Sequence, residues 1–368
     1  MKRLCIVIAV LLIFTLTLSA CSSKADAPAA APAETAVDTP SEPANDEPVE
    51  VAGGFTVAMV TDVGGINDQC FNQGAWEGLQ KLQADGIADD VKYLESKQES
   101  DYSQNLDRFA DAGIDVIWGI GFMMADAILN AAKVNPDNTY AIVDMAFGPD
   151  TPDNVICLVF DSQDCSFLVG YIAGMVTETN KVGVVGGIKG DLIDTFEFGY
   201  RGGVQYAAKE RGVDIEVLVQ YADSFTDAAK GKTIATTMYQ NGADIVFQAA
   251  GGVGVGVIEA AKELDKWAIG ADVDQNYLAP DNVLTSAMKY VNQGIYNVVS
   301  DLVAGKNLGG SIISGTLENG SVGYSPSSDK FVPADILAKT DDVKAKLISG
   351  ELTAPINEGT YNEFVAGL

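Results

Sequence analysis

The sequence predicts an α/β protein made of two doubly wound lobes, each built on a parallel sheet. From about residue 51 to residue 368, short apolar, β-branched runs alternate with longer stretches of helical period, which is the pattern of parallel α/β structure. The pattern runs twice, once before and once after about residue 160, and the chain is long enough for two separate cores. No short sequence period repeats, so a solenoid is not expected.

The expected strands are short and alternate with the expected helices. Strands are predicted at 55–60, 91–94, 114–118, 140–143, 155–160, 182–185, 215–219, 245–248, 267–269 and 283–288. Helices are predicted at 71–83, 103–112, 125–133, 166–176, 196–211, 227–241, 255–264 and 291–303, with a last one near 334–348. The first lobe is expected to comprise residues 51–160, completed by a segment near 285–320. The second is expected to comprise residues 161–284, completed by a segment near 321–368.

The N-terminal residues indicate export. Lys2 and Arg3 precede an apolar run over 4–18, and the small residues before Cys21 complete a secretory signal peptide, residues 1–20. The run is shorter than the roughly 20 residues of a membrane span. The motif at 18–21 resembles a bacterial lipobox, which implies lipidation of Cys21 and a lipid anchor on the extracytoplasmic face. An ordinary signal peptide with an incidental cysteine is the alternative.

Residues 21–50 are expected to form a disordered, acidic tether that begins at the lipidated cysteine. The stretch is rich in Ala, Pro, Glu and Asp, has Lys24 as its only basic residue and has no aromatic residue. Such a composition cannot bury enough apolar surface to fold. The tether would let the folded part stand away from the membrane surface.

Composition narrows the possible partners and chemistry. The net charge of -28 argues against nucleic acid and anionic lipid, because both favour basic patches. The absence of histidine removes the usual nucleophilic triads and most zinc and iron sites. Neither 226–233 nor 251–257 completes a phosphate-binding glycine motif. We therefore expect no cofactor and no metal, and we expect that the protein is not an enzyme.

Three cysteines remain in the predicted folded part, namely Cys70, Cys157 and Cys165. Their number and spacing fit neither a disulfide framework nor a zinc site. Cys157 and Cys165 are interpreted as small buried hydrophobic residues, with a disulfide between them as the alternative.

The residues at strand ends are candidates for a binding site, because open parallel sheets bind ligands beyond the carboxyl ends of their strands. Asp62, Asp144 and Asp272 follow predicted strands, where a carboxylate can accept hydrogen bonds from N–H or hydroxyl groups. A helix cap or turn role is the alternative for each. Phe71 and Phe196 each begin a predicted helix in a different half of the chain. Together they could sandwich a flat ring, although either alone is more often a core residue.

Two further positions complete the candidates. Lys289 can neutralise Asp272 and donate to a hydroxyl group, with a surface lysine as the alternative. Gly251 lies in a glycine-rich strand-to-helix turn whose backbone can approach a ligand closely.

Several blocks of the sequence occur together in the order seen in one known family. They are 60–62, 65–68, 71–73, 75–78, 167–174, 242–247, 250–252, 269–275 and 284–289. On these blocks the chain resembles the basic membrane protein family, which comprises lipoproteins that serve ABC transporters and includes purine nucleoside receptors. Cys70 stands where the family usually has serine, and residues 187–194 lack the proline common before the second aromatic. The second departure leaves the position of Phe196, and with it base selectivity, open.

The resemblance implies a type I periplasmic-binding-protein fold with a purine nucleoside in a hinged cleft between the lobes. Phe71 and Phe196 would then clasp the base, and Asp62, Asn67 and Asp144 would bind its polar edge. Asp272 and Lys289, with backbone near Gly251, would hold the ribose hydroxyls. The expected partners are an ABC permease and its ATPase, and the expected oligomeric state is a monomer.

Three alternatives share this pattern. A sugar or another small polar ligand could occupy the same fold, and the protein could be a ligand sensor for a membrane partner. A secreted hydrolase would use paired carboxylates such as Asp62 and Asp144.

Overall fold

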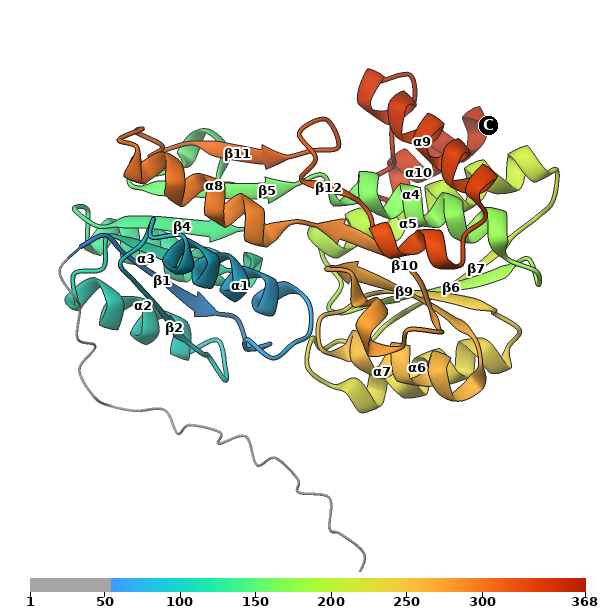
Figure 1. Ribbon diagram of the computed structural model, residues 1–368, viewed down its shortest axis with the longest axis horizontal. Coiled ribbons are helices and arrows are strands. Elements are labelled where there is room, and N and C mark those ends of the chain that lie inside the picture. Colours follow the sequence, from blue (N-terminus) through green and yellow to red (C-terminus); the bar gives the residue numbers. More distant parts are fainter. Residues whose placement is uncertain (1–53) are drawn as a thin grey trace, which may run out of the picture. The chain divides into compact units, whose positions relative to one another are not determined.

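The strands of the described part of the chain, residues 54–368 of a computed structural model, form two six-stranded sheets (Figure 1). All of these residues fall within one compact unit. The predicted signal peptide (1–20), the predicted lipidation site Cys21 and the predicted tether lie outside the described residues.

The first lobe contains a sheet with the strand order β11-β5-β4-β3-β1-β2, and every neighbouring pair is parallel. Its strands are β1 (Thr56–Thr61), β2 (Asp90–Leu94), β3 (Val116–Ile120), β4 (Thr139–Val143), β5 (Val155–Phe160) and β11 (Ile312–Gly315). Its helices are α1 (Phe71–Ala84), α2 (Asp101–Asp111), α3 (Ala125–Val134) and α8 (Val291–Val303), with short 3₁₀ turns η1 (Phe122–Met124) and η2 (Gly148–Asp150).

Strand β1 illustrates why the sheet is covered on both faces. Its six residues are all buried, and successive side chains of a strand point to opposite faces. Val57 and Met59 pack in the core on the side of α1 and α8, whereas Ala58 and Val60 pack in the core on the side of α2 and α3. A strand buried on both faces is a near-continuous apolar run, as its sequence shows.

The second lobe contains a sheet with the strand order β12-β10-β9-β8-β6-β7, parallel except for the antiparallel pair β10 and β12. Its strands are β6 (Lys181–Gly186), β7 (Glu216–Tyr221), β8 (Ile245–Ala249), β9 (Trp267–Asp272), β10 (Val283–Lys289) and β12 (Val322–Tyr324). Its helices are α4 (Ser162–Val176), α5 (Asp191–Arg211), α6 (Ala228–Gln240), α7 (Val253–Leu264), α9 (Ala334–Ser349) and α10 (Glu358–Gly367), with 3₁₀ turns η3 (Gln275–Leu278) and η4 (Pro326–Lys330).

Helices α4 and α5 pack together on one face of this sheet, and α6 and α7 pack on the other. A glycine allows α4 and α5 to approach each other closely, because a Cβ atom on Gly203 would lie 2.0 Å from the carbonyl oxygen of Phe167. This packing holds α5 in place, and the first turns of α5 carry Phe196 on the side that faces the first lobe.

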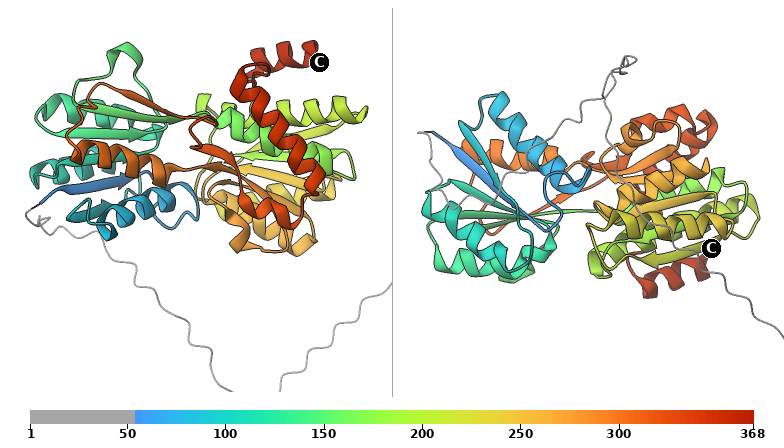
Figure 2. Two further views of the ribbon diagram at one scale, coloured as in Figure 1. Left: turned by 45° about the horizontal axis from the view of Figure 1, so that its top comes forward. Right: turned by 90° about the horizontal axis from the view of Figure 1, so that it is seen from below.

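The chain passes between the lobes at three places, between β5 and α4, between β10 and α8, and between β11 and β12 (Figure 2). The second of these corrects a predicted boundary. Residues 285–289 were expected in the first lobe, but they belong to β10, which pairs with β9 from Val283 to Met288. The apolar run predicts a strand and does not say which sheet the strand joins, so the crossing comes after Lys289.

The predicted α/β class with two parallel lobes is confirmed, and each predicted strand and helix has a counterpart. The short strands β11 and β12 and the helix α10 were not predicted. Helix α5 begins at Asp191, so Phe196 lies within this helix and the expectation that it begins the helix was wrong. The carboxylates of Asp191 and Asp194 in the first turn favour the earlier start, because they interact well with the helix dipole.

Two further properties concern the described residues. Cys70, Cys157 and Cys165 are each free and buried, so no disulfide joins Cys157 to Cys165. Among residues 54–368, no helix has the length and apolar character that crossing a membrane requires.

Candidate ligand-binding site

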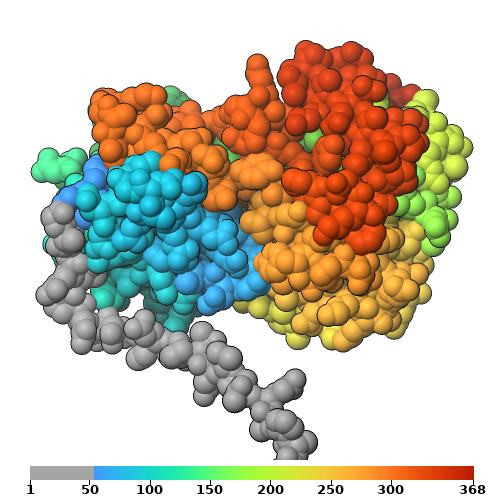
Figure 3. Space-filling view, viewed as in Figure 1, coloured from blue at the N-terminus to red at the C-terminus, as the bar shows by residue number. Residues whose placement is uncertain are grey.

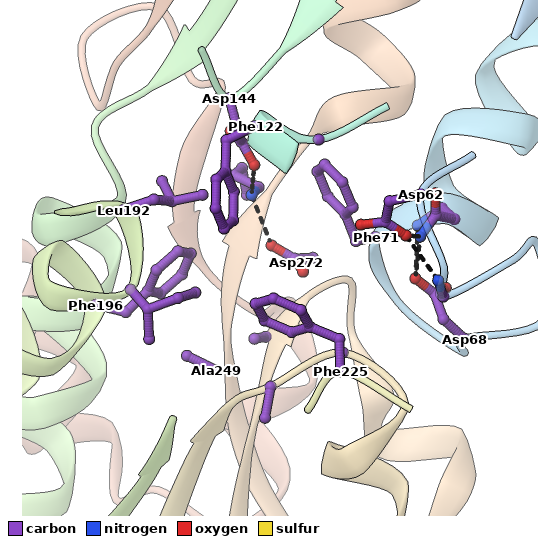
Figure 4. Close-up of a pocket in the computed structure, with 18 residues that line it drawn as sticks. Asp62, Asp68, Phe71, Phe122, Asp144, Leu192, Phe196, Phe225, Ala249 and Asp272 are labelled. Carbon is purple, nitrogen blue, oxygen red and sulfur yellow. Dashed lines mark hydrogen bonds and ion pairs between the residues drawn. The ribbon is translucent and has the colours of Figure 1, made fainter. Parts of the chain in front are cut away.

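A pocket lies between the two lobes, at the carboxyl ends of strands from both sheets (Figure 4). The space between its lining atoms is about 570 Å³, part of which is open to solvent. Its lining residues are Asp62, Gly64, Asp68, Phe71, Asn72, Gly121, Phe122, Asp144, Leu192, Ile193, Phe196, Phe225, Ala249, Ala250, Gly251, Ala271, Asp272 and Lys289.

A buried lysine between two aspartates forms the polar centre of the pocket. The Lys289 Nζ atom lies 2.6 Å from Oδ2 of Asp144 and 3.2 Å from Oδ1 of Asp272. Lys289 comes from the end of β10 in the second lobe, and Asp144 follows β4 in the first. The ion pair with Asp144 therefore joins the lobes at the pocket.

Burial and charge act on these groups in opposite directions. Burial lowers the pKa of Lys289, but the carboxylates of Asp144 and Asp272 raise it more, so the pKa stands above its usual value and the amine is charged. Burial raises the pKa of Asp144, and the nearby Lys289 opposes this shift. The second oxygen of Asp144, Oδ1, is buried without a hydrogen-bond partner in the described part of the chain. A ligand donor can bind this oxygen.

The backbone at both aspartates adopts an uncommon conformation. Asp144 has a φ of 64° and Asp272 a φ of 66°, in the left-handed region that non-glycine residues seldom occupy. Such conformations cost free energy and persist where the surrounding structure requires them, which is common at functional sites. Here they place both carboxylates against Lys289.

A second polar group lines the pocket wall contributed by the first lobe. Asp62 Oδ1 accepts hydrogen bonds from the Gly64 amide and the Asn72 side-chain amide, each at 2.8 Å. Asp68 accepts from the backbone N–H of Cys70, Asn72 and Gln73, which anchors the start of α1. Burial raises the pKa of Asp62 to about 6, although both of its hydrogen bonds act to lower it. Burial also raises the pKa of Asp68.

Four phenylalanines supply the apolar walls of the pocket (Figure 4). The Lys289 Nζ atom lies 4.6 Å from the ring centre of Phe71 and 5.4 Å from that of Phe196, so these rings from different lobes flank the lysine. Phe122 of the first lobe and Phe225 of the second meet edge to face, with ring centres 6.3 Å apart. Aromatic side chains from both lobes thus surround the charged centre.

Backbone of the second lobe completes the wall near Phe225. Ala249 ends β8, and Ala250 and Gly251 form the turn before α7. Gly251 has a φ of 59°, and a Cβ atom there would lie 3.1 Å from the Phe225 carbonyl oxygen. A residue with a side chain would be strained at this position.

The structure brings together most of the predicted site residues. Asp62, Phe71, Asp144, Phe196, Gly251, Asp272 and Lys289 all line the pocket. Asn67 does not: it is exposed and is not among the lining residues, and the neighbouring Asp68 turns inward instead, because its carboxylate binds the amides at the start of α1. Asp144 binds Lys289, whereas the resemblance grouped it with Asp62 at the base edge.

Sequence reasoning missed several lining residues, namely Asp68, Asn72, Leu192, Phe122 and Phe225. The strand-end rule does mark Phe122, which follows the predicted third strand, but Phe122 was not chosen as a candidate site residue. Phe225 lies in the loop between β7 and α6, and no local pattern marks it as a lining residue. Asp68 and Asn72 stand at the start of a predicted helix, where polar residues commonly cap the helix, so a place in the pocket was not predicted for them.

The fold and the pocket define a solute-binding protein of the two-lobed periplasmic type. Its backbone matches that of an ABC transporter solute-binding protein from Aeropyrum pernix K1 with a TM-score of 0.77 and 28% identity, over 85% of this chain and 98% of that one. It also matches a solute-binding protein from Conexibacter woesei in fold, with a TM-score of 0.65 at 24% identity, over 82% and 99% of the two chains.

Sequence comparison identifies the family. The model for ABC transporter substrate-binding proteins described as PnrA-like matches residues 55–358, so the chain belongs to this family, as the resemblance predicted. The chain is 42% identical over 324 residues to the CD4+ T-cell-stimulating antigen of Listeria monocytogenes, covering 82% of this chain and 88% of that protein. It is 36% identical over 318 residues to basic membrane protein B of Borreliella burgdorferi, covering 84% and 90%.

Proposed function

We propose that this protein binds a purine nucleoside in the pocket between its lobes and delivers it to an ABC importer. The observation that carries the proposal is the pairing of aromatic rings from both lobes with a buried aspartate–lysine–aspartate group. A nucleoside has a flat apolar base and a sugar rich in hydroxyl groups, and the pocket offers a surface suited to each.

The aromatic walls suit a planar base. Phe71 and Phe196 come from different lobes and both flank Lys289, so a ring between them would contact both lobes at once. Stacking of a base on an aromatic side chain contributes about 1–3 kcal/mol. Asp62 and Asn72 stand at the wall of the first lobe, and the Oδ1 atom of Asn72 is buried without a partner in the described part of the chain. These groups would bind N–H groups of the base.

The charged centre suits ribose. Asp272 and Asp144 accept hydrogen bonds, and Lys289 donates them, so each can bind a sugar hydroxyl. The described lining residues include four aspartates and one lysine, a formal charge of 1 − 4 = −3 when all are ionised. A phosphate group would be repelled by this excess of carboxylates. The ligand class is therefore an uncharged nucleoside and not a nucleotide.

The importer would recognise the protein by the closed arrangement of its lobes. Hinge closure around a ligand is the common motion of periplasmic binding proteins, and here the three interlobe crossings are the hinge. Residues from both lobes must meet to form the pocket, so a bound nucleoside would stabilise the closed form. No covalent step is involved, and the protein would act as a binding protein and not as an enzyme.

The site of action would be the extracytoplasmic face of the membrane. The basic motif and apolar run at 1–20, with Cys21 in a lipobox-like sequence, support an exported protein anchored by lipid, and relatives carry the name basic membrane protein. Its partners would be a permease and an ATPase.

Uptake of labelled guanosine tests the proposal. Cells that lack the protein should lose uptake, the wild-type gene should restore it and Phe71→Leu should not, because leucine lacks the stacking face. Phe109→Leu, in the first-lobe core away from the pocket, is the matched control and should restore uptake. Unchanged guanosine uptake in cells without the protein would refute the delivery role, and release of free guanine by stoichiometric protein would indicate a hydrolase instead.

A further inference from the structure

A chain of buried amide groups connects the pocket floor of the second lobe to the loop that carries Phe71 in the first. The Ala250 amide donates to Gln248 Oε1 at 3.0 Å, and Gln248 Nε2 donates to Gln275 Oε1 at 2.7 Å. The Gln275 Nε2 atom then donates to the carbonyl oxygen of Gln69, 3.0 Å away in the other lobe. Gln248 and Gln275 are fully buried.

Both ends of this chain adjoin residues that line the pocket. At one end, Ala250 is a lining residue, and the Ala271 amide, beside Asp272, also donates to Gln275 Oε1 at 3.2 Å. At the other end, Gln69 lies two residues before Phe71, the first residue of α1. The backbone of Gln69 has a φ of 60°, so its carbonyl is presented to the second lobe in a conformation that glutamine seldom adopts.

Tyr277 makes a second contact with Gln69 nearer the surface. The Tyr277 hydroxyl lies 3.2 Å from the Gln69 carbonyl oxygen and 3.0 Å from Gln69 Oε1. Tyr277 is 51% exposed, and it belongs to the same 3₁₀ turn, η3, as Gln275. On the face drawn in Figure 3, the start of the first lobe (blue) abuts the gold part of the second lobe.

We infer that Gln275 and Tyr277 form a latch on Gln69 that holds the cleft closed and fixes Phe71 in the closed form. The two donors belong to the second lobe and the acceptor to the first, so separating the lobes breaks both contacts. Since Gln275 also accepts from the Ala271 amide and is joined through Gln248 to the Ala250 amide, the latch and the pocket floor share one hydrogen-bonded unit. These two are positioning residues, because neither lines the pocket.

The latch sets how long a ligand stays bound. The ligand-free protein passes between open and latched forms, and a ligand enters the open form, which has no latch. Loss of the latch can only increase the open fraction, so the association rate should change little. The bound complex must release the latch before the ligand can leave. Loss of one ordinary hydrogen bond is expected to speed dissociation by about 2- to 10-fold.

Two variants and a control test the inference, which rests on the proposed function for its probe, guanosine. Tyr277→Phe removes only an exposed hydroxyl and is not expected to perturb folding. Gln275→Glu keeps the acceptor for Gln248 and Ala271 and removes the donor to Gln69. Tyr324→Phe is the matched control, because it removes a hydroxyl bound to Asp341 within the second lobe.

Kinetics of guanosine binding to immobilised protein give the first readout. Tyr277→Phe should dissociate about 2- to 10-fold faster and Gln275→Glu about 10-fold faster or more, with association rates within about 2-fold of the wild type. Tyr324→Phe should leave both rates unchanged. Equal dissociation rates in wild type and Tyr277→Phe would overturn the latch.

Hydrogen exchange of the ligand-free protein gives a second readout that needs no ligand. Tyr277→Phe should speed exchange in the two pocket walls together, at residues 62–73 and 249–252, without changing exchange in the strand cores. Identical exchange in both walls would overturn the latch. If the wild type does not bind guanosine, the proposed function fails, and this exchange measurement still decides on the latch.

Discussion

Replacing Lys289 by methionine should destabilise the protein severely, since the change leaves two buried carboxylates without their cation. The Nζ atom contacts Asp144 at 2.6 Å and Asp272 at 3.2 Å, and the lysine side chain is 3% exposed. Removal of one partner from a buried ion pair costs about 3–5 kcal/mol. Against a total stability of about 5–15 kcal/mol, this is a large fraction.

Urea unfolding followed by circular dichroism measures the loss. The matched control is Lys306→Met, because Lys306 pairs with Asp301 at 2.8 Å with side chains 59% and 42% exposed. An exposed pair contributes about 0–1 kcal/mol, so this control should unfold almost as the wild type does. Adding Asp144→Asn to Lys289→Met should recover part of the loss, because it removes one of the two buried carboxylates left without a cation. Asparagine also tolerates the positive φ at this position.

The deficit of Lys289→Met should also shrink as the pH falls. Burial already raises the pKa of Asp144, and losing the lysine would raise it further. The folded variant would then take up a proton at a higher pH than the unfolded chain does, so acid favours its folded state. A Lys289→Met protein within about 1 kcal/mol of the wild type at neutral pH would refute the account of this buried group.

Three further changes have defined outcomes. Gly187→Ala should weaken guanosine binding about 10-fold in calorimetry, because the added Cβ would lie 2.2 Å from the Phe225 ring. The control Gly190→Ala should bind normally, because a Cβ there meets nothing within 4 Å. Equal affinities of the two variants would contradict this. The wild type should lose stability as the pH rises from about 4 to about 6, because the raised pKa of Asp62 makes the folded protein hold a proton that the unfolded chain has lost. Asp62→Asn lacks this group, so its stability relative to the wild type should increase over the same range. Parallel stability curves in urea would argue against this shift. Asn357→Ala should lose about 1 kcal/mol of helix stability, seen as faster hydrogen exchange confined to α10, because the Asn357 side chain caps that helix; unchanged exchange there would exclude the capping role.

The sequence could predict the main strands because parallel strands buried on both faces are nearly continuous apolar runs. β5, Val155–Phe160, has the same bounds in the sequence pattern and in the structure. β11 and β12 escaped prediction for the opposite reason. β11 is an edge strand with exposed positions, and β12 has three residues, too few to show a period.

The strand-end rule found the carboxylates of Asp144 and Asp272, and the expected pairing of Lys289 with Asp272 is confirmed by their 3.2 Å contact. Asp144 and Asp272 stand at strand ends, so their proximity follows from topology. That Lys289 also binds Asp144 of the other lobe was not predicted, because this contact depends on how the two lobes meet and no local pattern records that. The resemblance placed Asn67 at the base edge, but the adjacent Asp68 turns inward instead, because its carboxylate binds the amides at the start of α1.

Calorimetric titration of the purified protein with guanosine, inosine, adenosine, cytidine, ribose and guanosine monophosphate measures directly whether the pocket binds a purine nucleoside. The proposed function predicts one site that binds the purine nucleosides, weak or no binding of ribose, cytidine and the nucleotide, and loss of purine binding in Phe71→Leu. Binding of ribose or another sugar with no response to any nucleoside would contradict it.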